Sequence, residues 1–216
     1  MPSSFLRIVL WLGVACGVLV LAARLTCLRW WQVPEDDPTL SASLAPTLRA
    51  GDWIVLWRLT PPGFGDLVLC PDPSDAAQVV IGRLVGEPDD ALEIDGEGVV
   101  RVNNVRMRSE VSCEHPTFEV DHPRSGDPVE LHCDIETMGG VHHQRALAGS
   151  GGLKPMPVNT KVPKDRIYLV SDNRQFPFDS RQYGAVPEES CSETVVFRLV
   201  SRLGFRNIDS RLTIIH

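Results

Sequence analysis

The sequence predicts a mostly β domain that follows a single N-terminal helix. Seventeen glycines and seventeen prolines in 216 residues favour turns and short strands over long helices. Short apolar runs, bounded by these turn residues, recur along the chain. The one long apolar segment lies at residues 8–23, and no later segment has a convincing helical pattern. The length suffices for one well-formed core beyond a membrane anchor.

The N-terminal segment is predicted to be a membrane anchor. Residues 8–23 carry no charge, and Arg7 and Arg24 flank them. A helix needs about 20 apolar residues to cross a bilayer. Residues 5–28 reach that length if the Arg24 side chain extends towards the water. We therefore assign residues 1–31 to the anchor.

Two tryptophans and a small-residue sequence decide between two interpretations of this segment. Trp30 and Trp31 follow the apolar run, at the depth where aromatic residues gather at a membrane interface. A cleaved secretory signal peptide that ends near Leu21-Ala22-Ala23 is the alternative. We favour the uncleaved anchor, because apolar character continues past Ala23.

The overall charge excludes one class of partner. Twenty-eight acidic residues against 21 basic ones give a formal net charge of −7. An acidic chain binds polyanions poorly, so nucleic acid is not an expected partner. Basic residues lie on both sides of the apolar segment, so the positive-inside rule does not orient it.

After a polar linker at 32–40, the predicted strands follow in two groups. The first group is expected within a core segment at 32–107, and the second within a core segment at 164–216. The predicted strands span 53–57, 66–70, 78–86, 92–94, 99–102, 166–170 and 193–200. The Asp95-Gly96-Glu97-Gly98 sequence predicts a hairpin turn between two of them.

Residues 108–163 interrupt this pattern. Histidines, glycines and prolines accumulate there, and periodicity is lost. We expect an inserted, weakly structured subdomain, with a flexible hinge at 149–152.

Six cysteines occur, none of them in a Cys-x-x-Cys pair, so no structural zinc site is expected. Cys113 and Cys133 flank a polar segment and are candidates for a disulfide if the domain is exported. Cys70 and Cys191 could pair only if neighbouring strands bring them together.

Two separated motifs carry the chemistry. The first runs Ser41-Ala42-Ser43-Leu44-Ala45-Pro46-Thr47-Leu48, directly before Gly51-Asp52 and an apolar strand. The second runs Ser171-Asp172-Asn173-Arg174, followed by Asp179-Ser180-Arg181 and Gly184. Serines before a proline also suit a simple turn, and a charged loop is often only solvated. Their combined spacing favours a functional site.

Together these motifs resemble the type I signal peptidase family, over residues 5–104 and 164–200. The resemblance implies a β-rich catalytic core with a long β-ribbon and a groove near the membrane. It also implies a Ser/Lys dyad and no cofactor or metal. The expected partners are extended segments of exported pre-proteins, bound as an added strand. The catalytic domain of this cell-membrane protein is then expected to face away from the cytoplasm.

The resemblance also assigns residue roles. Ser43 matches the nucleophile, and Ser41 matches a serine that helps to form the oxyanion hole. The residues of the second motif are expected to brace the site through charge-assisted hydrogen bonds. These supporting residues are Asp172, Asn173, Arg174, Asp179 and Arg181.

One assigned position departs from the family. Gly82 stands where the family has its general-base lysine, and Pro177 stands where it has a serine thought to orient that lysine. A serine hydroxyl is a weak nucleophile until a base takes its proton. Arg83 cannot serve, because a guanidinium stays protonated.

Few other residues offer a replacement base. The chain has three lysines, Lys154, Lys161 and Lys164, all late in the sequence. His142 and His143 are conceivable rescue bases, because a histidine needs little pKa tuning.

Two functions therefore stay open. The first is a signal peptidase I-like membrane-anchored serine endopeptidase that removes signal peptides from exported proteins. The second is a catalytically impaired pseudo-peptidase that binds extended peptides as a chaperone or assembly factor. The presence or absence of a base beside Ser43 discriminates between them.

Overall fold

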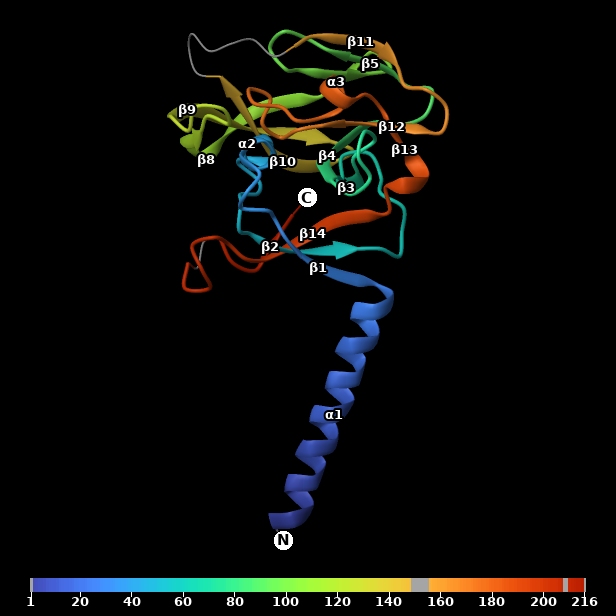
Figure 1. Ribbon diagram of the computed structural model, residues 1–216, viewed down its shortest axis with the longest axis vertical. Helices are drawn as coiled ribbons and strands as arrows, with labels where there is room; N and C mark the ends of the chain where they lie inside the picture. Colours follow the sequence, from blue (N-terminus) through green and yellow to red (C-terminus); the bar gives the residue numbers. More distant parts are fainter. Residues whose placement is uncertain (1, 149–155, 208–209, 216) are drawn as a thin grey trace.

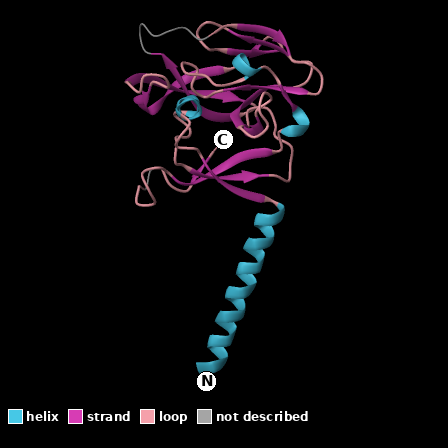
Figure 2. Ribbon diagram, in the orientation of Figure 1, coloured by secondary structure: helices cyan, strands magenta, loops and turns pink. Residues whose placement is uncertain are grey.

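The computed structural model describes residues 2–148, 156–207 and 210–215. A single long helix, α1 (Pro2–Thr26), stands away from a β-rich domain (Figure 1). Strands dominate that domain, as Figure 2 shows, which confirms the predicted fold class. Residues 6–24 of α1 are long and apolar enough to cross a membrane, and none of this span is buried by the protein.

The strands form three antiparallel sheets. The main sheet follows the order β1 (Leu28–Gln32), β2 (Trp53–Trp57), β14 (Glu193–Val200), β3 (Leu67–Pro71), β4 (Val79–Gly86), β12 (Arg166–Val170) and β13 (Val186–Pro187), with β15 (Thr213–Ile214) paired to β14. A second sheet contains β11 (Val158–Lys161), β5 (Ala91–Ile94), β6 (Val100–Val102) and β7 (Val105–Arg106). The third contains β10 (Val141–Ala148), β9 (Pro128–Met138) and β8 (Arg108–Asp121).

Short helices complete the domain: α2 (Pro38–Leu44), α3 (Ser180–Tyr183) and a 3₁₀ turn, η1 (Glu188–Ser190). Neither short α-helix was expected from the sequence, because each spans only one or two turns and shows no helical periodicity. Side-chain caps begin both of them. Asp37 accepts a hydrogen bond from the amide of Leu40, and Asp179 accepts one from the amide of Arg181.

The central strands are buried because their sequences are mainly apolar. In β4, every residue from Val80 to Gly86 is buried. On one side of the main sheet, Leu40 and Leu44 from α2 pack in the same cluster as Ile54 and Ile81. This burial holds α2 against the sheet, and α2 carries the first motif.

The 108–163 segment is more ordered than the sequence analysis predicted. Residues 108–148 are almost entirely the three strands of the β8–β9–β10 sheet, while β11 belongs to the sheet of β5. A period-2 pattern was present and was missed: Leu131 and Cys133 are buried, whereas Glu130 and His132 are exposed. The predicted hinge at 149–152 lies outside the described residues.

Two disulfides tie the β-rich domain together. Cys113–Cys133, which the sequence analysis named as a candidate pair, joins β8 to β9. Cys70–Cys191 joins the end of β3 to the residues just before β14. Adjacent strands therefore do bring the second pair together, a point that the sequence left open.

The two disulfides are expected to stabilise the domain unequally. They enclose sequence separations of 121 residues for Cys70–Cys191 and 20 for Cys113–Cys133. Loop-closure entropy then predicts a loss of about 5 kcal/mol for Cys70→Ala/Cys191→Ala and about 3 kcal/mol for Cys113→Ala/Cys133→Ala. Urea unfolding of the two double variants measures both values. A larger loss from the shorter loop contradicts this ranking.

Candidate active site

The two sequence motifs meet at one place in the fold. The amide of Asn173 donates a hydrogen bond of 3.0 Å to the carbonyl of Ser43. The Asn173 side-chain amide donates another, of 2.7 Å, to the carbonyl of Ala42. These residues are 130 positions apart in sequence, so the fold places α2 directly against residues 171–174, which we call the recognition loop.

Ser43 is buried and its hydroxyl is already engaged. The side chain has no exposed surface, and Oγ donates a 2.8 Å hydrogen bond to the carbonyl of Leu40, one turn earlier in α2. Within the described residues, no lysine, histidine or carboxylate is hydrogen-bonded to this oxygen. Ser43 can attack a carbonyl only after the bond to Leu40 breaks and a base takes the proton.

Ser41 faces a groove beside α2. The groove has a volume of about 580 Å³ and is lined by Ser41 and Ala42 from α2, by Ala45 just after that helix, and by Glu119 and Val120 from β8. The Ser41 hydroxyl accepts a 3.1 Å hydrogen bond from the amide of Ala50. Its own proton stays available for a group in the groove, as an oxyanion donor requires.

Gly82 lies where a side chain has no room. It is buried in β4, opposite Val68 on β3. A Cβ atom at this position meets the Cβ of Leu169, on β12, at 2.9 Å and the Val170 backbone at 3.5 Å. The neighbouring strand therefore occupies the space into which a longer side chain would project.

None of the other candidate bases in the described residues is hydrogen-bonded to Ser43. Lys161 pairs with Asp89 at 2.8 Å, and Lys164 is exposed near η1. Lys154 lies outside the described residues. The His142 ring is hydrogen-bonded to the Thr137 side chain, and the His143 ring is hydrogen-bonded to the Glu136 carboxylate.

His143 is the more interesting of the two histidines because it is buried. Burial and the nearby charge of Arg83 lower its pKa, so it is neutral at neutral pH. Its Nε2 lies 3.2 Å from Glu136, while Nδ1 has no hydrogen-bond partner. Its bond partner is therefore a carboxylate of β9 rather than the Ser43 hydroxyl.

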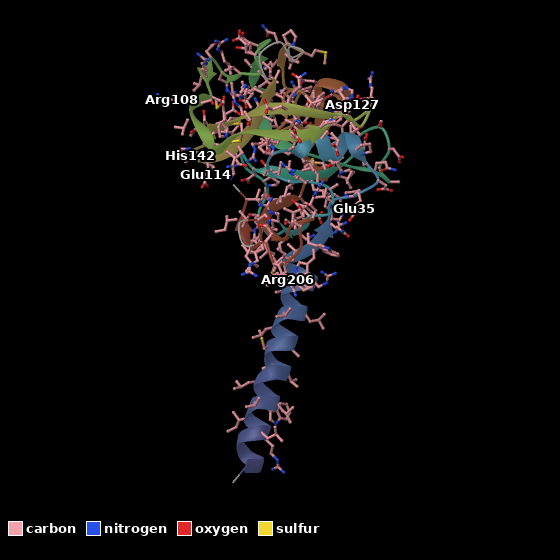
Figure 3. The ribbon with its side chains drawn as sticks, turned by 90° about the vertical axis from the view of Figure 1, so that its left-hand side faces the viewer. Glu35, Arg108, Glu114, Asp127, His142 and Arg206 are labelled. Atoms are coloured by element: carbon pink, nitrogen blue, oxygen red, sulfur yellow. A yellow bond between two sulfur atoms is a disulfide. The ribbon has the colours of Figure 1, made fainter. Side chains whose placement is uncertain are left out.

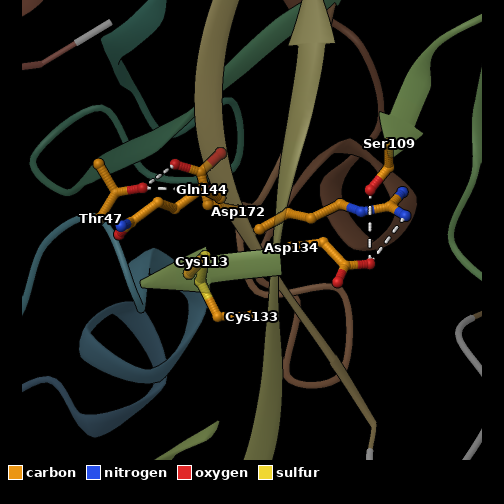
Figure 4. Close-up of a disulfide and its surroundings, with 8 residues drawn as sticks. Thr47, Ser109, Cys113, Cys133, Asp134, Gln144 and Asp172 are labelled. Carbon is orange, nitrogen blue, oxygen red and sulfur yellow. Dashed lines mark hydrogen bonds and ion pairs between the residues drawn. A yellow bond between two sulfur atoms is a disulfide. The ribbon is translucent and has the colours of Figure 1, made fainter. Parts of the chain in front are cut away.

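A fully buried ion pair joins the core to the recognition loop. Arg83 donates two hydrogen bonds to Asp172, of 2.7 and 2.8 Å. Asp172 also accepts a 2.6 Å hydrogen bond from Thr47, which follows α2; Figure 4 shows this contact. Burial alone would raise the pKa of Asp172, but the charge and hydrogen bonds of Arg83 outweigh it and lower that pKa.

A second buried cluster connects the recognition loop to the β8–β10 sheet. Arg174 and Arg145 both pair with Glu136 on β9. Burial alone would raise the pKa of Glu136, but the charge of Arg174, the hydrogen bond from His143 and the charge of Arg145 lower it to about 2. Backbone contacts add to this, because the amide of Arg174 donates to the carbonyl of Ala146 on β10.

Asp179 and Arg181 brace the other end of the recognition loop. The carboxylate of Asp179 accepts hydrogen bonds from the amide of Ser171 at 2.8 Å and from the Arg181 guanidinium at 2.9 and 2.6 Å. Pro177 lies in the sequence between Ser171 and Asp179. Its carbonyl accepts a hydrogen bond from the side-chain amide of Gln182.

Several residues of the site were not singled out by the sequence analysis. Arg83 was considered only as a possible base, although a charged residue within a buried apolar strand is itself a signal of a buried ion pair. Thr47 stood within the first motif but received no role there. Glu136 and Leu169 gave no comparable signal, because their importance depends on which strands lie next to each other.

Gly82→Ala is expected to lower the free energy of unfolding by about 1–3 kcal/mol, because the new methyl group overpacks against Leu169. Gly63→Ala is the matched control, since a Cβ at Gly63 has Asp66 as its nearest neighbour, at 3.8 Å. The control is expected to change stability by less than about 0.5 kcal/mol. Equal unfolding midpoints in urea for the two variants contradict the crowding at Gly82.

Acid is expected to destabilise the domain through Glu136. Its pKa falls from 4.5 to about 2 on folding, so the unfolded chain binds more protons between these values. Stability present above about pH 4.5 is lost as pH falls towards 2, and the loss amounts to about 3 kcal/mol. Folding also lowers the pKa of His143 from 6.5. Protonation of His143 therefore adds a loss of stability that begins as the pH falls below about 6.5.

Urea unfolding across this pH range tests the expectation. Glu136→Gln should remove the steep loss below pH 4.5, and at neutral pH it should cost about 3–5 kcal/mol because it leaves buried arginines unpaired. Glu130→Gln, exposed on the same strand, is the control and should keep the wild-type pH profile. An unchanged profile in Glu136→Gln would refute the assignment.

Comparison with known proteins supplies the family. A family model described as "Signal peptidase, peptidase S26" matches residues 6–200. The chain is 22% identical over 192 residues to the "Probable signal peptidase I-1" of Synechocystis sp., covering 84% of this chain and 79% of that protein. It is 25% identical over 182 residues to the "Probable signal peptidase I-2" of the same organism, covering 79% and 66%.

A third relative aligns with a smaller share of both chains. The "Signal peptidase I" of Buchnera aphidicola subsp. Acyrthosiphon pisum is 26% identical over 197 residues, covering 69% of this chain and 63% of that protein. The chain thus spans less than two thirds of the length of two of these three relatives. Because the family model matches nearly the whole chain, this protein belongs to the S26 family of signal peptidases.

Proposed function

We propose that this protein binds extended segments of exported pre-proteins at a membrane surface, as a signal peptidase I-type protein with Ser43 in the position of the nucleophile. The observation that carries the proposal is the contact between the two motifs: Asn173 holds the backbone of α2 at Ala42 and Ser43. The groove beside α2 is the proposed peptide-binding cleft, with Ser41 as its hydrogen-bond donor.

The supporting residues act in this proposal as a scaffold. Asp172, Arg174 and Asp179 each use a buried ion pair to fix one part of the recognition loop. Asn173 and Arg181 complete the connections to α2 and α3. None of these groups needs to move a proton, so peptide binding does not require the missing base.

A membrane location agrees with the arrangement of the domain. β1 follows α1 directly, and the strands β1, β2 and β14 lie at the end of the domain next to the helix (Figure 1). Arg206 lies at this same end (Figure 3). Exposed apolar side chains accompany these strands and the C-terminal segment: Trp30, Trp53, Leu203, Phe205, Leu212 and Ile214. Such residues suit the interface of a bilayer whose core α1 spans.

The two disulfides favour an extracytoplasmic domain. Disulfides persist in oxidising compartments and are rare in the cytosol. Cys70–Cys191 and Cys113–Cys133 both lie in the β-rich domain rather than in α1. We therefore place the domain on the outer side of a cell membrane, with α1 as a single-pass anchor.

Hydrolysis by this chain alone is disfavoured by three features. The Ser43 hydroxyl donates to a main-chain carbonyl of its own helix. Leu169 fills the space next to Gly82, the position that the resemblance gives to the lysine. The histidines proposed as rescue bases are bonded to Thr137 and Glu136. We accordingly favour a peptide-binding pseudo-peptidase, acting as a chaperone or assembly factor.

Signal-peptide cleavage is the second candidate function. The S26 family match and the presence of both Ser41 and Ser43 in α2 favour it. An active enzyme needs a base that reaches Ser43 from outside the described residues or from another protein.

Binding and cleavage can be separated with three variants and a fluorescent pre-protein peptide. We expect Val120→Trp, which narrows the groove, to weaken binding roughly tenfold, while Val111→Trp on the same strand leaves it unchanged. Ser43→Ala should retain binding, because the serine hydroxyl does not line the groove. Fluorescence anisotropy with the detergent-solubilised chain measures binding, and mass spectrometry of the same samples measures cleavage.

Efficient cleavage by the unmodified chain that disappears in Ser43→Ala contradicts the pseudo-peptidase and supports the second candidate. Equal binding by the Val120→Trp and Val111→Trp variants contradicts the assignment of the groove.

A further inference from the structure

We propose that a second pocket, lined by three arginines, binds an oxyanion of the phosphate or carboxylate class. The pocket has a volume of about 490 Å³ and lies where β7 leads into β8. Arg106, Arg108, Arg145 and Ser109 supply its polar lining, and apolar residues supply the rest. Its lining shares no residue with the groove beside α2, so it is a separate site.

Positive charge accumulates at this pocket without local compensation. Arg106 lies directly opposite Arg101 in the β6–β7 pairing, and like charges in that position repel. Glu93 pairs with Arg101 at 3.1 Å and neutralises it. In the described part of the chain neither Arg106 nor Arg108 has an ion-pair partner. This local excess contrasts with a chain whose net charge is −7.

Arg145 is the buried arginine of the pocket, because it is only 4% exposed. Its Nη1 donates to Glu136 at 3.0 Å, and its Nη2 lies 3.5 Å from Asp134. Its Nε has no hydrogen-bond partner. A buried donor without a partner destabilises the protein unless another group satisfies it.

The nearby carboxylates do not cancel this charge. Glu136 is shared with Arg174, which has no exposed surface, and Asp134 is the one other carboxylate paired with Arg145 among the described residues. Ser109 donates a weak, 3.4 Å hydrogen bond to Asp134 (Figure 4). Three guanidinium groups therefore face the pocket against the single charge of Asp134, which leaves a net charge favourable to a bound anion.

The chemistry of the lining defines the ligand class. A guanidinium presents a planar set of donors that matches the oxygens of phosphate and carboxylate groups. Val99, Val105 and Met107 add apolar surface beside these donors. Arg108 lies in the half of the domain away from α1 (Figure 3), so a dissolved ligand or a peptide side chain suits the pocket better than a lipid headgroup.

The test is a titration of the detergent-solubilised full chain with inorganic phosphate and, in parallel, with succinate. Sodium chloride at equal ionic strength controls for screening. Isothermal calorimetry should detect binding of at least one of the two anions to the wild type. The Arg106→Gln/Arg108→Gln variant should bind it roughly tenfold more weakly, because it loses two charge-assisted contacts.

Arg124→Gln/Arg206→Gln is the matched control, since it removes the same charge from two exposed arginines outside the pocket. It should bind the anion as the wild type does. The relative strength of the phosphate and succinate arms then identifies which oxyanion the pocket prefers. The proposal is overturned if neither anion gives more heat than chloride, or if both double variants lose affinity equally.

Discussion

The ion pair between Arg83 and Asp172 is the interaction on which the rest of this site depends. It joins β4 to the recognition loop, across 89 positions of sequence, with both side chains fully buried. Asp172 also accepts a hydrogen bond from Thr47, which follows α2 in the sequence. Arg83 also donates a hydrogen bond to the carbonyl of Gly65. Removal of one partner leaves a buried charge without compensation, at a cost of about 3–5 kcal/mol. The relative positions of Ser43 and Asn173 follow from this connection.

The chemistry of the same buried layer underlies our proposal that the site binds peptides rather than transfers protons. Its cations are arginines, namely Arg83, Arg174 and Arg181, each paired with a carboxylate. A guanidinium keeps its proton, so none of these groups can act as a general base. A catalytic lysine needs a desolvated space beside the serine that lowers its pKa. At Gly82, the position that we propose for that lysine, an added Cβ atom meets the Cβ of Leu169 at 2.9 Å.

The β8–β10 sheet forms part of the site scaffold rather than a separate appendage. Glu136 on β9 pairs with Arg174, and Ala146 on β10 forms an isolated bridge with Asn173. Val120 on β8 lines the groove beside α2. Three strands that are contiguous in sequence thus contact the recognition loop and the groove. The Cys113–Cys133 disulfide lies within the same sheet (Figure 4) and holds β8 to β9.

The sequence by itself determined the apolar helix, the buried strands and the two motifs, because these depend on local periodicity, turn residues and spacing. It also offered Cys113 and Cys133 as a candidate pair, which the structure joins. Only the tertiary structure decided the partners: Arg83 for Asp172, Glu136 for Arg174, and Leu169 against Gly82. It likewise showed that residues 108–148 form a sheet. Such contacts depend on which strands become neighbours, and that choice is made by packing of the whole core rather than by any short stretch of residues.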